Sequence, residues 1–179
     1  MVLRRLHGGC HDDVAVCDGL LYAIFNDDDD DSDDDGSIVI HVYSIPMLQR
    51  TSVIDISCAG RSHWHTLCVN ANGMFVSCDF TDSVIKMSLD GKQITTYDGK
   101  KGNDIGEFDE PNACMSDKYG NMLIADSFND RLQLLHGEQW FVLQLEPPLS
   151  RPCRAVYDSS ALFVATWNPL AIVKYDEIE

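Results

Sequence analysis

The sequence repeats itself at a fixed distance. Residues 120–135 read GNMLIADSFNDRLQLL, and residues 73–88 read GMFVSCDFTDSVIKMS. At a period of 47 residues, three positions match one-to-one: Gly73 with Gly120, Asp79 with Asp126, and Ile85 with Leu132. A period of this size predicts stacked structural units, because a single unit cannot bury its apolar face alone.

The pattern within and around the repeat is that of β-strands. Short β-branched and aromatic runs recur about every 8–12 residues, separated by Gly, Asn, Asp and Pro, whereas no long stretch has the helical period. The predicted strands are residues 20–25, 37–45, 65–70, 74–79, 83–89, 93–98, 112–117, 121–126, 131–136, 140–145, 154–158, 161–166 and 171–175. The chain is therefore expected to be all-β.

These strands fall into four units of a single domain that covers residues 1–179. The units span about 11–57, 62–100, 108–147 and 151–179. Gly19 and Gly73 are 54 residues apart, whereas Ile40 and Ile85 are 45 apart, and the difference equals the length of the acidic tract 27–35. We expect this tract to be a disordered loop inserted between the second and third strands of the first unit, because like charges repel and solvate.

Units of this length and strand content predict the blades of a β-propeller, which arranges four-stranded sheets around an axis. The last unit stops after three strands. Residues 2–6, VLRRL, could complete it as a borrowed strand, or could equally end a blade whose beginning is missing.

The charge, the apolar runs and the cysteines of the chain limit its partners and its location. The formal net charge is −16, and eight of the acids lie in the 27–35 tract, so the remainder is still acidic. An acidic chain is a poor match for a phosphate backbone. No apolar run approaches the ~18 residues of a membrane helix. Seven cysteines without a CxxC motif favour reduced, buried thiols. Residues 1–10 have no apolar region of the signal-peptide kind, so the expected location is cytoplasmic.

The third unit resembles an NHL repeat. The residues that carry the resemblance are Gly102, Gly106, Phe108 and Pro111 at the blade entry, the Gly120-Asn121 turn, and Asp126, Asn129 and Arg131 in the following hairpin. Asp126 and Arg131 flank a four-residue turn and can pair across the hairpin. Leu132 and Leu134 share one strand face and should pack between blades.

The other units depart from this pattern. The second has Trp64 in place of Pro111 and Val84 in place of Arg131, and the fourth has Thr166 in place of Asp126. NHL propellers usually have six blades, so the resemblance implies an NHL-type propeller with about four blades present, as part of a six-bladed one. The style of the blades is similar to the C-terminal domains of tripartite-motif ubiquitin ligases, which select substrates while separate modules perform the ligation.

One rim of the propeller is the expected binding face. The turns after the second and fourth strands of each blade open on this rim, where loops on a rigid scaffold concentrate binding residues. The candidates are Trp64, Phe80, Asp82, Phe128, Asn129, Trp167 and Asn168. The competing interpretation is that Phe80, Phe128 and Trp167 fold back onto the blades as core.

The resulting functional prediction is a non-catalytic module that binds a protein or peptide, possibly a basic one, without cofactor or metal. RNA binding is the first alternative, but the lysines and arginines are scattered along the chain. A metal-dependent lactonase-like enzyme is the second, since Asp79, Asn112, Asp126 and His65 could approach the channel mouth. His63 and His65 alone lack the remaining ligands of a metal site.

Overall fold

The computed structural model describes residues 13–27, 37–56, 65–98, 101–117, 119–158 and 161–176. Within these ranges the chain is built from antiparallel strands, with a single 3-10 turn, η1 (Ser127–Asn129). No helix in the described part could cross a membrane. Residues 2–6, most of the acidic tract, and the candidate Trp64 lie outside the described residues.

The strands form four separate sheets. Sheet 1 contains β1 (Asp13–Cys17), β2 (Leu20–Asp27), β3 (Ser37–Ser44) and β4 (Gln49–Ile56). Sheet 2 contains β5 (His65–Asn70), β6 (Gly73–Cys78), β7 (Ser83–Met87) and β8 (Gln93–Asp98). Sheet 3 contains β9 (Pro111–Ser116), β10 (Met122–Asp126), β11 (Arg131–His136) and β12 (Gln139–Val142). Sheet 4 contains β13 (Pro152–Asp158), β14 (Ala161–Trp167) and β15 (Leu170–Asp176).

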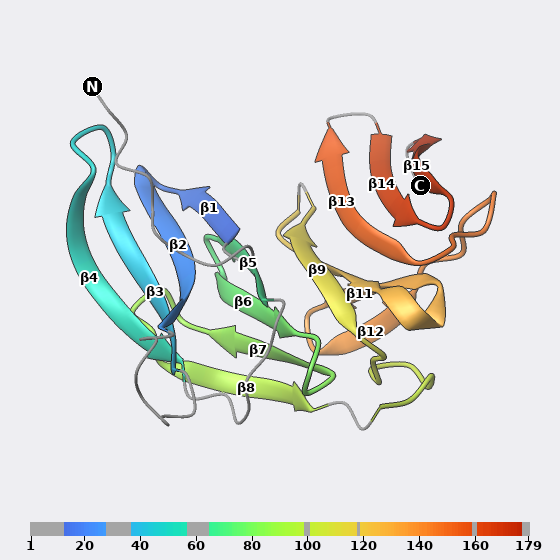
Figure 1. The fold of residues 1–179 in the computed structure, drawn as a ribbon, viewed down its shortest axis with the longest axis horizontal. Helices are drawn as coiled ribbons and strands as arrows, with labels where there is room; N and C mark the ends of the chain where they lie inside the picture. Colours follow the sequence, from blue (N-terminus) through green and yellow to red (C-terminus); the bar gives the residue numbers. More distant parts are fainter. Residues whose placement is uncertain are drawn as a thin grey trace.

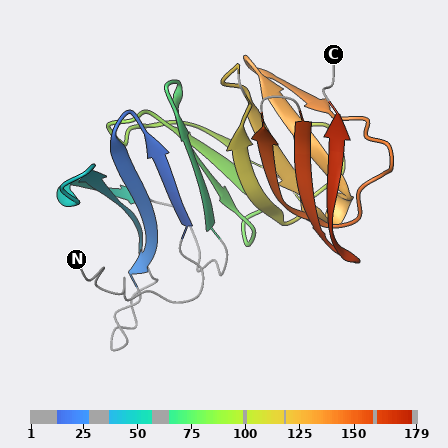
Figure 2. The same cartoon turned by 90° about the horizontal axis from the view of Figure 1, so that it is seen from above.

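Each sheet is a simple meander, and the four sheets follow one another along an arc (Figure 1). The first strand of each sheet lies toward the inside of the arc, and the later strands lie progressively farther out. Seen from above, neighbouring sheets stand face to face (Figure 2). This is the arrangement of blades around an axis.

Three apolar seams hold neighbouring sheets together. The first seam joins sheets 1 and 2 through residues such as Ile40 and Val76. The second joins sheets 2 and 3 around Phe108 and Ile124, and the third joins sheets 3 and 4 around Leu132. Leu134 packs against this third seam, as its shared strand face with Leu132 predicted.

Asp13 joins the first strand of sheet 1 to sheet 2 and to sheet 4. The Asp13 carboxylate on β1 accepts a hydrogen bond from the Leu67 amide of β5 at 3.1 Å. The same oxygen lies 3.3 Å from the Arg154 guanidinium on β13, in a pair whose arginine is mostly exposed. The outward faces of the end sheets carry exposed apolar residues, among them Val16 and Ile172.

The sequence prediction missed two strands, both in sheet 1. β1 is only five residues long and was hidden in a region without a repeat partner. β4 begins with four exposed polar residues, and its apolar alternation is limited to Ile54 and Ile56 at the end. Both strands are anchored in the first seam, β4 through these two residues and β1 through Ala15 and Cys17.

The one-to-one match at a period of 47 is wrong by one residue. In sheet 2 the hairpin pairs Cys78 with Ser83, and in sheet 3 the same position pairs Asp126 with Arg131. The structural offset over this hairpin is therefore 48, so Asp126 corresponds to Cys78 and not to Asp79. A one-residue shift exchanges the two faces of a strand. Accordingly Val84, not Ile85, occupies the place of Leu132 in facing the next sheet.

Cysteines behave as small apolar residues. Cys68, Cys78 and Cys114 are buried, and every cysteine that the structure describes is a free thiol. Burial is the main cause that raises the pKa of the Cys68 thiol to about 11. It raises the pKa of Cys114 as well, so these thiols stay protonated at neutral pH and are poor nucleophiles.

The second seam should depend on one aromatic side chain. Phe108 is fully buried and meets the Trp140 ring edge-on, with ring centroids 5.2 Å apart. Replacing Phe108 by Ala should lower the free energy of unfolding by about 3–5 kcal/mol, because it leaves a large cavity. Urea denaturation measures this, with Phe141→Ala on an exposed position of β12 as the control. Equal losses of unfolding free energy in the two variants would show that the second seam does not depend on Phe108.

Candidate functional site

Three of the predicted aromatic residues are exposed on turns of the blades. Phe80 lies in the β6–β7 turn, Phe128 in the β10–β11 turn, and Trp167 at the end of β14. Their side chains are 65%, 41% and 56% exposed, respectively. They therefore do not fold back as core, which was the competing interpretation.

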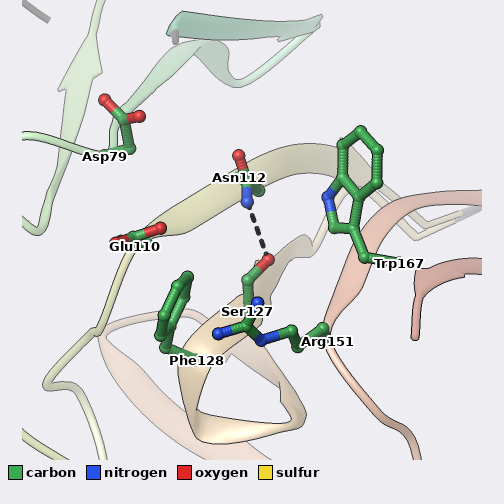
Figure 3. Close-up of a pocket in the computed structure, with 7 residues that line it drawn as sticks. All are labelled: Asp79, Glu110, Asn112, Ser127, Phe128, Arg151 and Trp167. Atoms are coloured by element: carbon green, nitrogen blue, oxygen red, sulfur yellow. Dashed lines mark hydrogen bonds between the residues drawn. The ribbon is translucent and has the colours of Figure 1, made fainter. Parts of the chain in front are cut away.

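A cleft of about 320 Å³ lies where sheets 2, 3 and 4 meet on this rim. Seven residues from all three sheets line it (Figure 3): Asp79, Glu110, Asn112, Ser127, Phe128, Arg151 and Trp167. The Asn112 side-chain amide donates to the Ser127 hydroxyl at 3.0 Å, as the dashed line in Figure 3 marks. This bond joins β9 to η1 within sheet 3, which forms the middle of the cleft.

A buried carboxylate fixes the turn beside the cleft. Asp126 is fully buried at the end of β10. Its oxygens accept hydrogen bonds from the Asp109 amide at 2.8 Å, from the Asn129 side chain at 2.9 and 3.0 Å, and from the Gln133 side chain at 2.9 Å. The Arg131 Nε donates to it at 2.7 Å, which confirms the predicted pairing across the hairpin.

The partners of Asp126 hold the segment that leads into sheet 3. Arg131 donates to the carbonyl oxygens of Asn103, Asp104 and Glu107 at 2.5, 2.9 and 3.0 Å. The fully buried Gln133 donates to the Glu107 carbonyl and accepts from the Gly106 amide. Gly106 has a φ of 86°, and a Cβ there would press on the Trp140 ring. Gly106, Asp126, Asn129 and Arg131, which carry part of the NHL resemblance, thus belong to one structural network.

Glu110 is held in a left-handed conformation that turns its side chain to the cleft. Its φ is 51°, which is uncommon for a residue with a side chain. Its amide donates to the Asp82 carboxylate at 2.8 Å, and its carbonyl accepts from the Ser127 amide at 3.4 Å. The Glu110 carboxylate itself has no hydrogen bond or ion pair to any other residue that the structure describes.

Two cations lie against the Phe128 ring, which lines the cleft near Glu110 (Figure 3). The Arg151 guanidinium lies 4.1 Å from the ring centroid and the Lys101 ammonium 5.9 Å from it. Lys101 also pairs with the Asp109 carboxylate at 2.9 Å. Arg151 has no carboxylate partner for its side chain among the described residues, although its amide donates to Asp130.

The acids of this region destabilise one another. Burial raises the pKa of Glu110, and the nearby Asp109, Asp79 and Asp82 raise it further, while Lys101 opposes them. Burial likewise raises the pKa of Asp82, and Asp109 adds to the effect. Perturbed carboxylates in a cleft are a feature of functional sites.

The sequence prediction found only part of this cleft. Phe128 and Trp167 line it, Asp82 supports Glu110 from behind, and Phe80 is exposed but does not line it. Asn129 serves the Asp126 network, and Asn168 is an exposed turn residue. Glu110 and Arg151 were missed, and their only signal was that each directly precedes a proline at a blade entry.

Of the channel-mouth residues named for the enzyme alternative, two lie together and one does not. Asp79 and Asn112 line the cleft, whereas Asp126 is buried away from it in its own network. The side chain of His65 lies outside the described residues. Over the described ranges, no three His, Cys, Asp or Glu side chains are placed to share a metal ion.

Comparison with known proteins identifies the fold. No family model and no curated protein matches the sequence. Among solved structures, a protein of unknown function from Bacteroides thetaiotaomicron is 19% identical, with a TM-score of 0.67 over 92% of this chain and 46% of that one. Virginiamycin B lyase from Staphylococcus aureus is 10% identical, with a TM-score of 0.59 over 92% of this chain and 55% of the lyase. Glutaminyl cyclase from Myxococcus xanthus is 9% identical, with a TM-score of 0.56 over 92% and 64%.

This chain has the β-propeller fold. The all-β prediction and the repeat character are confirmed, since the similar structures are propellers and the four sheets stand as blades. Identities this low show the fold alone. The chain spans between 46% and 64% of the length of these structures.

Removing the buried carboxylate should weaken the whole rim. Asp126→Ala leaves Arg131 and Gln133 without their shared acceptor, so we expect unfolding to require about 3–5 kcal/mol less free energy. Chemical denaturation measures the loss. Asp104→Ala removes an exposed carboxylate from the same entry segment and should change stability little. A small effect of Asp126→Ala would contradict the prediction, because it would show that the stability of the protein does not depend on this network.

The charge on Glu110 should cost stability at neutral pH. Its pKa is raised in the folded state, so the folded protein holds this proton more tightly than the unfolded chain does. This loss of stability is absent at pH values below the ordinary pKa of a glutamate side chain, where Glu110 is protonated in both states. It develops as the pH rises through the raised pKa of the folded state. Glu110→Gln should therefore raise the urea midpoint at pH 7 but not at pH 3.5. A gain of equal size at both pH values would contradict this.

Proposed function

We propose that this chain is a non-catalytic protein-interaction module of the NHL type. The observation that carries the proposal is the group of exposed aromatic side chains, Phe80, Phe128 and Trp167, on turns of a rigid scaffold next to a cleft. Exposed aromatic residues with polar neighbours are typical of protein-binding surfaces, where they supply most of the binding energy.

The residues of the third blade support the NHL assignment within the propeller class. Asp126, Asn129 and Arg131 form a single hydrogen-bonded unit with the blade entry, which gives the matched motif a physical role. We further propose that the module selects substrates for a tripartite-motif-like ubiquitin ligase in the cytoplasm. In that arrangement, any ligase activity belongs to other modules.

Charge favours a protein over RNA as the partner. The cleft is bordered by Asp79 and Glu110, with Asp82 behind them, and the chain carries a net charge of −16. An RNA backbone requires a cationic surface instead. The solved propellers that resemble this chain include a lyase and a cyclase, but likeness at this level of identity carries no activity.

Substitution of the rim tests the proposal. Phe80→Ser combined with Trp167→Ser removes two exposed aromatic side chains without touching a seam, so circular dichroism should be unchanged. Affinity purification from cells with quantitative mass spectrometry should show at least one protein retained by the unsubstituted chain and lost by this variant. Phe141→Ser, an exposed aromatic position on β12, is the matched control and should retain it.

Two results would overturn the proposal. One is an identical set of retained proteins for the rim variant and the unsubstituted chain. The other is tight binding of mixed-sequence RNA in a mobility-shift assay at ~0.1 M salt, where the Debye length is about 10 Å and weak surface attraction is screened.

A further inference from the structure

We propose that the cleft between sheets 2, 3 and 4 binds a lysine or arginine side chain of a partner peptide, held between Glu110 and Trp167. The proposal rests on the proposed function, since it specifies which chemistry the protein-binding rim selects. The supporting observations are the unsatisfied carboxylate, the arrangement of cations, and the exposed aromatic wall.

One acid that lines the cleft lacks a partner. The Glu110 carboxylate has no hydrogen bond or ion pair with another described residue. Lys101, whose charge acts on Glu110, is 2.9 Å from Asp109 and so is already engaged. A cationic ligand group would neutralise Glu110 and relieve its repulsion with the neighbouring acids.

The backbone of Glu110 is held in a left-handed conformation at the edge of the cleft. Asp82 binds its amide and Ser127 binds to its carbonyl, so the conformation is fixed from two blades. Backbone conformations of this kind persist where the surrounding structure enforces them. The point from which the side chain enters the cleft is therefore set before any ligand arrives, which lowers the part of the entropic cost of binding that comes from the backbone.

The aromatic wall is available on one side only. Arg151 already lies over the Phe128 ring, 4.1 Å from its centroid, and Lys101 approaches the same ring. Trp167 is 56% exposed and lines the opposite end of the cleft (Figure 3). Tryptophan is the best aromatic partner for a cation, and Trp167 is therefore the ring left for the ligand.

Arg151 orients the rest of the ligand. Its guanidinium has donors to spare, since no described carboxylate pairs with it. A peptide whose basic side chain reaches Glu110 can present a main-chain carbonyl to Arg151. A cleft of about 320 Å³ suits one long side chain with its adjoining backbone. The Ser127 hydroxyl accepts from Asn112 and donates to the Pro152 carbonyl, so it does not compete for the ligand.

Binding can be followed with three short peptides. The probes are acetyl-Gly-Gly-Lys-Gly-Gly-amide, its norleucine analogue and its glutamate analogue, titrated into ¹⁵N-labelled protein. The chain has three tryptophans, so Trp167→Phe assigns the Trp167 indole signal by its disappearance. We expect the lysine probe alone to shift this signal and the Glu110 amide. Shifts of equal size with the norleucine probe would overturn the proposal.

Variants of one residue complete the test. Glu110→Gln should weaken the lysine probe about fivefold or more, and Glu110→Lys should reverse the preference toward the glutamate probe. Glu138→Gln is the matched control, because Glu138 is an exposed acid in the β11–β12 turn and does not line this cleft. It should leave binding unchanged. Lysine binding that survives Glu110→Gln would refute the assignment.

This outcome is separable from that of the proposed function. If Phe80→Ser with Trp167→Ser loses a protein partner but the lysine probe does not bind, the rim recognises proteins by another chemistry. If the lysine probe binds at Glu110 but no partner depends on the rim aromatic residues, the cleft is real and the broader proposal fails.

Discussion

The rim of this propeller depends on one buried negative charge. Asp126 has no contact with solvent, and its two oxygens accept five hydrogen bonds from the blade entry, the turn and the next strand. A carboxylate in this position is tolerated only because every lone pair is used and a guanidinium lies against it. The entry segment and the 3-10 turn take their positions from this arrangement.

The sequence predicted interactions between residues that are close in the chain better than those between distant residues. The Asp126–Arg131 pair and the packing of Leu132 follow from local spacing, and the structure confirms both. The sequence alone could not determine whether the repeat offset is 47 or 48 residues, because the first hairpins of sheets 2 and 3 differ in length. That turn has two residues between Asn70 and Gly73, and five between Ser116 and Met122.

The cleft was less predictable than the fold because its residues come from three blades. Glu110 precedes β9 and Arg151 precedes β13, and nothing in their local sequence marks a shared site. Only the curvature of the arc brings them to one place. The aromatic residues on the turns were found because turns of repeated blades share a rim, which is a property of the repeat itself.

The ion pair between Asp13 and Arg154 joins the first and last sheets, and it is the weakest of the links described between sheets. The seams between neighbouring blades are continuous and apolar, whereas the first and last sheets meet near the axis through Asp13 and Arg154. A solvent-exposed ion pair contributes little and is screened by salt. The molecule is therefore stiff along the arc of apolar seams and weakly held between its first and last sheets. Ionic strength sets how strongly these two sheets attract each other.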